Sequence, residues 1–463
     1  MQACVELGGT ISGEHGIGLE KMEAMRLVFS DVDIAAQKSM QDAFDPPRLL
    51  NPGKIFPDTG TAVKTSESKK MAADVGIVKP GTAEDEMILT VRRAAAEKRA
   101  ILPLGNGRHQ DYGNQPAQSA DPLYSAPLAD IIELDSPNQV VTVGAGMSLQ
   151  SLQKLLAAHQ QWLPVRPPLT LLQHSLGGLA ALGACGPERM VYGAPRDLLL
   201  GLSFISGEGR FISTGGRVVK NVAGYDLTRL MTGSAGTLGL ITRLSFRIAA
   251  LPEQCTAIIA GGSLKDCALA ATEIQTSHLG PVSITARPAN GDNQDGWKLV
   301  VGFEGFSQTI ESQVTATDAL FKQAGLNSGE VLNYDVHQGL HGSIYADLEQ
   351  SPFVLRVDLP QDRLKGFIDR GKDRPAFSRV LLDFACGRIL AGADTFDDAA
   401  WLYCSKFTAD ADGHAVLEKA PSDFKKQHDV FGQPRPEWKI MHRIKGVLDP
   451  HGIFAPGRLP GKV

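Results

Sequence analysis

Four glycine-rich loops between residues 105 and 242 carry the residue types best suited to binding a charged ligand. Glycine lets successive backbone N–H groups turn toward an anion, and it leaves room for a flat ligand against the backbone. One such loop is explained equally well as a turn, and small residues also suit a closely packed helix. Four clusters in one stretch predict a long ligand that crosses several loops. They are residues 105–113, 175–187 with 192–197, 215–227, and 233–242.

A strand that enters a helix through Gly144 and Gly146 raises the alternative of a Rossmann nucleotide site. That fingerprint needs a third glycine where Leu149 stands, and an acidic residue about 20 positions later to bind the ribose. The later region, residues 164–168, is Pro-Val-Arg-Pro-Pro. The sequence therefore excludes a Rossmann site here.

Composition excludes several other classes of protein. The 6 cysteines form no CxxC pair, so zinc and iron–sulfur clusters lack their usual ligand spacing, and we expect reduced thiols in a cytoplasmic protein. The net charge of -5 does not favour nucleic acid as a partner. No apolar run reaches the ~18 residues of a membrane span, so we expect peripheral membrane association only through partners.

The elements that must position these loops follow from apolar periodicity and helix-stop signals. We predict strands at 75–78, 100–104, 131–134, 140–143, 198–206, 210–213 and 240–249, and helices at 83–98, capped by Thr82, and at 149–159, 266–276 and 308–323. Residues 58–72 are polar and read as a linker. Glycine density falls after Pro252, which marks a second boundary. The predicted units are residues 1–62, 63–250 and 251–463.

The chain also contains a distant internal repeat. Residues 45–54 (DPPRLLNPGK) match residues 449–458 (DPHGIFAPGR) at an offset of 449 − 45 = 404. In both copies Asp-Pro stops a helix, two apolar residues follow, and Pro-Gly turns the chain before a basic residue. The repeat predicts that one kind of domain ends in this way, and that the chain starts with the end of one such domain.

The motifs GGRVVKNVAGYDL (215–227) and GSAGTLGLIT (233–242) resemble the FAD domain of the vanillyl-alcohol oxidase/p-cresol methylhydroxylase flavoproteins, and more narrowly the E subunits of glycolate oxidases. Residues 8–54, with GGTISGEHGIG at 8–18, resemble the C-terminal end of the D subunits. The resemblance implies an α+β fold, with a two-lobed FAD-binding domain of this type and a smaller α+β cap domain on the substrate side.

The resemblance also implies a set of cofactor contacts. The loop 105–113 would wrap the pyrophosphate, with Arg108 as a phosphate cation and His109 as a hydrogen-bonding loop residue. Because Arg108 separates His109 from the glycines, we expect noncovalent FAD. The candidate FAD-binding residues are Gly105, Asn106, Gly107, Arg108, His109, Gly113, Gly177, Gly178, Cys185, Gly186, Tyr192, Gly193, Gly236, Thr237, Leu238, Gly239, Ile241 and Thr242.

Four residues are candidates for catalysis. His15 matches the histidine of a Glu-His-Gly motif in hydroxy-acid-oxidising relatives, although the flavin it would face there belongs to a domain absent from this chain, so a solvated remnant is the alternative. His414 keeps one histidine where such relatives have a metal-binding pair, and one ligand does not make a metal site. Lys220 and Tyr225 are placed either near the flavin or in a structural contact.

Together these features predict an FAD-binding subunit of a glycolate oxidase-like dehydrogenase that acts on a small 2-hydroxy acid. Its expected partners are a D-type subunit and an iron–sulfur subunit. One alternative is an FAD-binding or structural subunit that does not itself oxidise substrate. Another is a non-functional product of a fused or disrupted gene pair.

Overall fold

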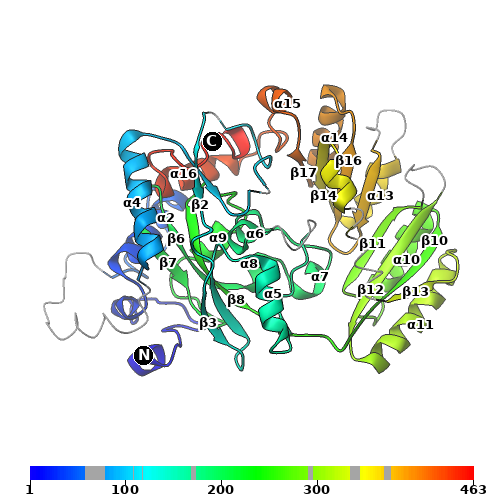
Figure 1. The fold of residues 1–463 in the computed structure, drawn as a ribbon, viewed down its shortest axis with the longest axis horizontal. Helices are drawn as coiled ribbons and strands as arrows, with labels where there is room; N and C mark the ends of the chain where they lie inside the picture. Colours follow the sequence, from blue (N-terminus) through cyan, green and yellow to red (C-terminus); the bar gives the residue numbers. More distant parts are fainter. Residues whose placement is uncertain are drawn as a thin grey trace, which may run out of the picture.

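The computed structural model describes residues 1–57, 79–107, 109–116, 118–167, 174–289, 296–333, 342, 345–369 and 377–462. The predicted linker at 58–72, the predicted strand at 75–78 and Arg108 lie outside the described residues. Figure 1 shows two lobes side by side, with the chain passing once from the first to the second before its end returns to the first.

The first lobe is built on a five-stranded antiparallel sheet in the order β3-β4-β8-β6-β7. Its central strand β8 is buried along most of its length, with Arg243 partly buried and Arg247 exposed at its end. The helices α5, α6 and α9 pack with this sheet in one apolar core. The strands are β3 (Ile131–Asp135), β4 (Val140–Gly144), β6 (Leu199–Ile205), β7 (Phe211–Gly215) and β8 (Leu240–Arg247), and the helices are α5 (Leu149–Ala157), α6 (Leu176–Leu182) and α9 (Leu227–Met231).

A smaller unit precedes this sheet and leads into the first glycine loop. Helix α4 (Thr82–Glu97) is followed by β1 (Ile101–Leu104), which pairs in parallel with β2 (Asp121–Tyr124). The prediction that Thr82 caps α4 is wrong. Gly81 is the N-cap, and its backbone N–H donates to Glu84 Oε2 at 2.6 Å. A helix can begin in this way because the glutamate side chain satisfies an otherwise unpaired backbone N–H.

The second lobe is an eight-stranded sheet with its main core on the side of helices α10, α11, α13 and α14. The strand order is β13-β10-β12-β11-β15-β16-β14-β17, and every pairing is antiparallel. The elements are β10 (Gln254–Gly262), α10 (Leu264–Thr276), β11 (Ser283–Pro288), β12 (Trp297–Gly305), α11 (Ser307–Gln323), β13 (Glu330–Asn333), β14 (Phe353–Asp358), α13 (Gln361–Asp369), β15 (Arg379–Asp383), β16 (Arg388–Ala393), α14 (Asp398–Asp410) and β17 (His414–Lys419).

Short elements complete the two lobes. Strands β5 (Gln161–Trp162) and β9 (Ala249–Ala250) form a two-stranded ribbon, and α15 (Ser422–Gln427) leads out of the second lobe. The remaining elements are α1 (Gln2–Glu6), η1 (Glu23–Leu27), α7 (Arg189–Tyr192), α8 (Pro195–Leu198) and η3 (Pro460–Lys462).

The two copies of the repeat lie together on the first lobe. Helix α2 (Asp31–Phe44) precedes the first copy and α16 (Trp438–Leu448) precedes the second, and the two helices pack against each other (Figure 1). Helix α2 begins at a capping box formed by Ser30 and Asp33, and Asp33 Oδ1 also accepts a hydrogen bond from the Ser213 N–H of β7 at 2.7 Å. The N-terminal segment is therefore docked on the first lobe.

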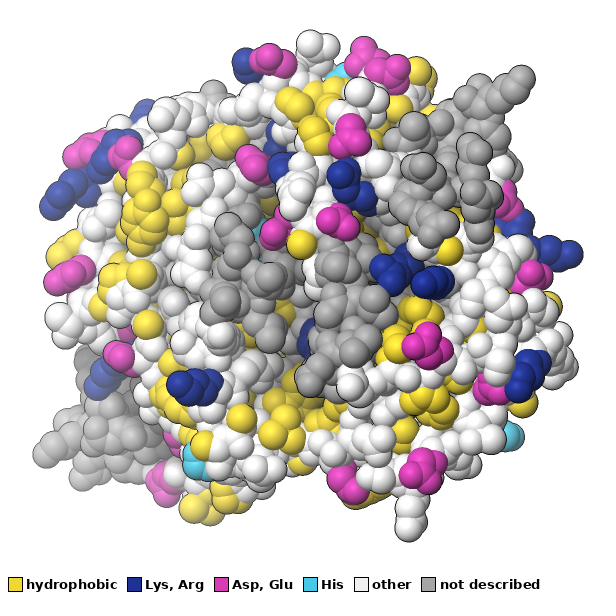
Figure 2. Space-filling model, turned by 45° about the vertical axis from the view of Figure 1, so that its right-hand side comes forward, with side chains coloured by type: hydrophobic (Ala, Val, Ile, Leu, Met, Phe, Trp, Pro, Cys, Tyr) yellow, Lys and Arg dark blue, Asp and Glu magenta, His cyan; other side chains and the backbone are white. Residues whose placement is uncertain are grey.

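On the face shown in Figure 2, basic and acidic side chains are interspersed. No helix among the described residues is long and apolar enough to cross a membrane.

Candidate active site

A narrow cleft in the first lobe, here called the glycine cleft, lies where three of the predicted loops meet. It encloses about 80 Å³ between the end of β1, the N-terminal half of α6 and the turn before β8. Small residues dominate its walls, so backbone atoms form much of the surface. The lining residues are Pro103, Leu104, Gly105, Asn106, Gly107, His109, Ser125, His174, Ser175, Gly177, Gly178, Ala181, Leu182, Ala235, Gly236, Gly239, Leu240, Ile241 and Arg458.

Half of the candidate cofactor residues line this cleft. They are Gly105, Asn106, Gly107, His109, Gly177, Gly178, Gly236, Gly239 and Ile241. Other candidates among the described residues have different surroundings. Thr237 and Thr242 are buried and donate to the backbone carbonyls of Ser234 and Ser203, while Leu238 belongs to the apolar core. Tyr192 donates to Glu304 Oε2 at 2.8 Å, across the boundary between the lobes.

Two glycines of the first loop are required by geometry. A Cβ on Gly105 would lie 1.8 Å from Ser175 Oγ, the atom that caps α6, so a side chain there would push β1 and α6 apart. Gly107 has φ of +70, in the region that strains other residues, and its N-terminal neighbours line the cleft. Gly144 and Gly146 serve packing instead, since a Cβ on each would lie about 2 Å from the carbonyl oxygens of Leu128 and Ser125.

The C-terminal repeat holds the first glycine loop in place. The buried Arg458 donates through Nη2 to the carbonyls of His109 at 2.7 Å and Gln110 at 2.9 Å, and through Nε to that of Tyr112 at 2.8 Å. Gly113 lies so close to this residue that a Cβ would be 2.8 Å from the Arg458 carbonyl oxygen. The glycine motifs alone did not indicate Arg458 as a site residue; the signal that could have found it is its place as the basic residue that ends the repeat.

A second residue of the same tail holds the fourth loop. Lys445 Nζ donates to the carbonyl of Thr237 at 2.7 Å and that of Phe454 at 2.7 Å, and it pairs with Asp449 at 2.5 Å. Burial lowers the pKa of Lys445, and Asp449 opposes this shift. The tail therefore ties together two glycine loops that are far apart in sequence.

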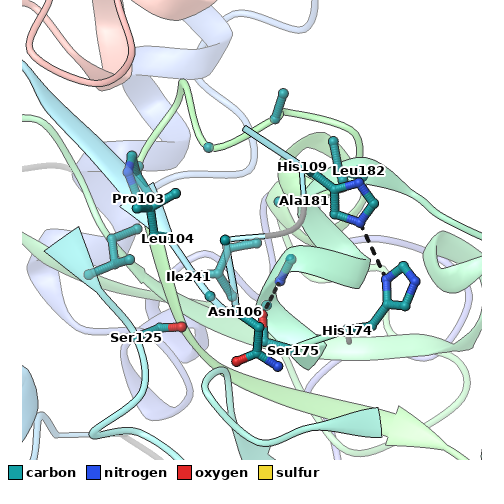
Figure 3. Close-up of a pocket in the computed structure, with 18 of the residues that line it drawn as sticks. Pro103, Leu104, Asn106, His109, Ser125, His174, Ser175, Ala181, Leu182 and Ile241 are labelled. Atoms are coloured by element: carbon teal, nitrogen blue, oxygen red, sulfur yellow. Dashed lines mark hydrogen bonds between the residues drawn. The ribbon is translucent and has the colours of Figure 1, made fainter. Parts of the chain in front are cut away.

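Two histidines stand at one end of the glycine cleft. His109 Nε2 lies 3.4 Å from His174 Nδ1, and the two rings are tilted by 45° with these nitrogen atoms directed toward each other (Figure 3). Both residues, with Leu182, also line a second and wider space of about 340 Å³, here called the interlobe cavity. The glycine cleft and the interlobe cavity thus meet at the histidine pair and form one elongated site.

The interlobe cavity lies between the first glycine loop, the end of α6 and strands β14, β16 and β17 of the second lobe. Its charged lining balances three basic residues, Arg356, Arg388 and Lys419, against three acidic residues, Asp111, Glu349 and Glu418. Its other lining residues include Tyr112, Cys185, Tyr345 and Leu390. Of the two neighbouring cofactor candidates Cys185 and Gly186, only Cys185 lines the interlobe cavity. Gly186 lines a small hollow beside this cavity.

Both arginines are held by carboxylates. Arg356 contacts Glu418 at 2.9 Å and Asp358 at 3.1 Å, and Arg388 contacts Asp358 at 2.6 Å. Burial disfavours the charged form of Arg356, but Glu418, Tyr112 and Asp358 outweigh it and raise its pKa. No local sequence pattern indicates these residues, because they come from strands that meet only in the folded sheet.

The four catalytic candidates line neither the glycine cleft nor the interlobe cavity. His15 is exposed in the N-terminal segment, and Lys220 pairs with Glu14 of that segment at 3.2 Å. Tyr225 stacks on Phe56 with ring centroids 5.9 Å apart. Lys220 and Tyr225 were expected either near the flavin or in structural contacts, and in the structure both contact the N-terminal segment.

His414, the fourth candidate, is exposed at the start of β17. Burial of part of its ring and the nearby Arg435 lower its pKa. No group of three metal-ligating side chains suited to a metal ion occurs among the residues that the structure describes.

The residues present fit a dinucleotide with a flat ring system. The glycine cleft is narrow and bounded by backbone, as a pyrophosphate requires, and it opens into a wider cavity at the boundary between the lobes. Ser234, in the loop beside Ala235 and Gly236, has a buried hydroxyl without a hydrogen-bond partner among the described residues.

Comparisons with known proteins agree with this geometry. A family model described as "FAD binding domain" matches residues 76–215. A second, "FAD linked oxidases, C-terminal domain", matches residues 1–55 and again 432–459, so both copies of the repeat match the same kind of domain end. The resemblance of the N-terminal segment to such a tail is confirmed.

Several curated proteins are similar over part or most of their length. Glycolate oxidase subunit GlcE of Escherichia coli (strain K12) is 37% identical over 335 residues, which are 71% of this chain and 84% of that protein. Glycolate oxidase subunit GlcD of Bacillus subtilis (strain 168) is 32% identical over 188 residues, 40% of this chain and 39% of that protein. D-lactate dehydrogenase of Archaeoglobus fulgidus is 30% identical over 180 residues, with 39% and 40% covered.

Among solved structures, an alkyldihydroxyacetonephosphate synthase matches with a TM-score of 0.58 at 16% identity, over 80% of this chain and 75% of that one. This likeness concerns the fold alone. Together with the match to the FAD-binding domain, it confirms the predicted fold class of an α+β, two-lobed FAD-binding domain with a cap.

Proposed function

The chain belongs to the FAD-linked oxidases, and on this premise we propose that it is the FAD-binding subunit of a dehydrogenase that acts on a small 2-hydroxy acid such as glycolate. The observation that carries the proposal is the union of the glycine cleft with the interlobe cavity at the histidine pair. When bound, FAD supplies a two-electron acceptor for oxidation of a CH–OH group.

In this proposal different groups of residues contact the pyrophosphate, the ring system and the substrate. The cofactor-binding set is the one predicted from the sequence, with Arg108 as a phosphate cation, extended by Arg458 and Lys445, which fix the loops around the pyrophosphate. The interlobe cavity receives the ring system and excludes water between the two lobes. His109 and His174 stand where cofactor and substrate meet, and Arg356, Arg388 and Lys419 provide the cationic wall for a substrate carboxylate.

We propose noncovalent attachment, because His109 is engaged by His174 and does not follow the paired glycines directly. We propose that the partners of this chain are a D-type subunit and an iron–sulfur subunit. The chain works in the cytoplasm and reaches the membrane through these partners. Two of the relatives are themselves named as subunits of glycolate oxidase.

Purified protein tests the proposal directly. Its visible absorbance should be that of an oxidised flavin, and acid precipitation should leave free FAD in the supernatant. Anaerobic addition of glycolate or D-lactate should bleach the flavin band. A well-folded but colourless preparation that takes up no FAD would refute the proposal, and a flavin that stays with the precipitated protein would refute noncovalent attachment.

One observation favours a second candidate, an FAD-binding subunit without substrate oxidation of its own. Arg356 and Arg388 are already paired with carboxylates, and the charged lining of the cavity balances. A substrate carboxylate would have to compete with those ion pairs. Under this alternative the flavin is not bleached by glycolate in the isolated chain but is bleached once a D-type subunit is added.

A further inference from the structure

The two copies of the repeat have the same backbone conformation as well as similar sequences. The residue that ends the helix is Asp45 in the first copy (φ -129, ψ 69) and Asp449 in the second (φ -135, ψ 69). Three later positions have positive φ in both copies, pairing Arg48 with Gly452, Asn51 with Ala455, and Gly53 with Gly457. The N-terminal copy is therefore a fully formed second example of the same structural element.

The C-terminal copy shows what this element does. Ile453 and Phe454 enter the apolar cluster of α4 and β1, where the Ile101 N–H donates to the Ile453 carbonyl at 2.7 Å and the Ala455 N–H to the Ile101 carbonyl at 2.8 Å. The segment thus covers the edge of β1 that does not face β2. Arg458 then reaches the glycine loop that follows β1. The element is a clasp that closes an FAD-binding lobe.

The N-terminal copy presents the same clasp to solvent. Leu448, Ile453 and Phe454 are 2%, 1% and 0% exposed, whereas the residues at the same offset, Phe44, Leu49 and Leu50, are 48%, 75% and 66% exposed. All six are large and apolar. Lys54, at the position of Arg458, is also exposed.

The rest of the N-terminal copy is anchored. Ala36, Met40 and Ala43 of α2 belong to the core of the first lobe, and Gln37 Oε1 accepts from the Tyr225 N–H at 3.1 Å. The exposed clasp therefore projects from a fixed base.

We propose that residues 44–54 dock on the β1-type strand and α4-type helix of a second FAD-linked oxidase chain, a D-type subunit whose own clasp is missing. The identity of this partner rests on the proposed function. The chain carries two ends of FAD-linked oxidase type, and the C-terminal one packs on the FAD-binding domain matched at residues 76–215, while the N-terminal clasp covers no such strand edge among the described residues.

Several features favour a D-type subunit over a second copy of this chain as the partner of residues 44–54. In a second copy of this chain the matching edge of β1 is already covered by its own Ile453 and Phe454, so an intact copy offers no vacant groove. The charge also matches, because Lys54 would bring an ammonium group to loop carbonyls like those that Arg458 binds. Gln41 stands where Lys445 stands in the C-terminal copy, and it retains a hydrogen-bond donor.

A graft tests whether the exposed clasp is competent. The graft gives residues 449–458 the sequence of residues 45–54 in the full chain. The substitutions are His451→Pro, Gly452→Arg, Ile453→Leu, Phe454→Leu, Ala455→Asn and Arg458→Lys. We expect a monomer that keeps its fold and an FAD affinity within about tenfold of wild type. An Ile453→Asp/Phe454→Asp variant should lose far more. A graft that unfolds, or that binds FAD no better than the double aspartate variant, overturns the proposal.

A binding experiment tests docking between chains. A full-length chain with Ile453→Asp/Phe454→Asp cannot bury its own clasp on β1 and stands in for the D-type partner, and tagged wild-type protein should capture it. Leu49→Asp/Leu50→Asp in the full-length protein should weaken capture by about 100-fold or more, whereas Leu402→Asp, at an exposed apolar residue of the second lobe, should not.

Equal capture by the wild-type and Leu49→Asp/Leu50→Asp proteins, or capture by neither, overturns docking. The flavin spectrum and glycolate oxidation of wild type are measured separately. The proposed function can therefore fail or hold independently of docking.

Discussion

Replacing Arg458 with alanine should release the first glycine loop and weaken FAD binding. The guanidinium makes three hydrogen bonds of 2.7, 2.8 and 2.9 Å to loop carbonyls, and it is only 5% exposed. A hydrogen bond from a charged donor is worth about 1.5–3 kcal/mol, and the loop can relax to recover part of the loss. We therefore expect a cost of about 3 kcal/mol, or roughly a 100-fold increase in the Kd for FAD.

The assay is titration of apoprotein with FAD, followed by flavin fluorescence, with thermal unfolding as a check on the fold. Arg458→Lys keeps the charge but loses the planar fork, so about a tenfold increase in Kd is expected. Arg443→Ala, at an exposed position of the same tail, is the matched control and should bind FAD like wild type. An Arg458→Ala variant with a Kd within about threefold of wild type would contradict the role of the clasp.

Three further outcomes are expected. Gly107→Val should abolish FAD binding while largely keeping the fold, because a β-branched residue resists φ of +70; unchanged FAD affinity would show that this loop is not the cradle. Burial raises the pKa of Glu188 from 4.5 to about 7, so between these pH values the folded chain holds a proton that the unfolded chain releases. The free energy of unfolding should therefore fall by up to about 3 kcal/mol as pH rises from 4.5 through 7. The melting temperature of Glu188→Gln should not show this fall with rising pH. If the melting temperatures of wild type and Glu188→Gln fall in parallel, Glu188 is not the group responsible. Deletion of residues 1–57 should lower the melting temperature but keep FAD, since none of them lines either cavity; loss of flavin would refute this.

The N-terminal segment shows how sequence and structure contribute differently. The repeat at an offset of 404 identified residues 45–54 as a domain end from residue types alone, because helix stops and Pro-Gly turns are encoded locally. Which copy is covered and which is exposed depends on what packs against each loop. Leu49 and Ile453 have similar sequence surroundings and opposite burial.

The motifs at 215–227 and 233–242 were enough to indicate the fold class and FAD through their family resemblance, while the glycine loops, strand periodicity and helix stops are local properties that predicted a long ligand and most of the elements. It placed strands such as β4 and β6 within a few residues, while the cap of α4 differed because the side chain of Glu84 replaced that of Thr82. The folded chain, and no local motif, brings Arg458 to the first loop, 345 or more residues away along the chain, and His109 to His174. It also brought Arg356 and Arg388 to the interlobe cavity and paired both with Asp358. Such contacts join strands and loops that are distant in sequence, and their geometry is set by packing of the two lobes, which no local pattern of residues records.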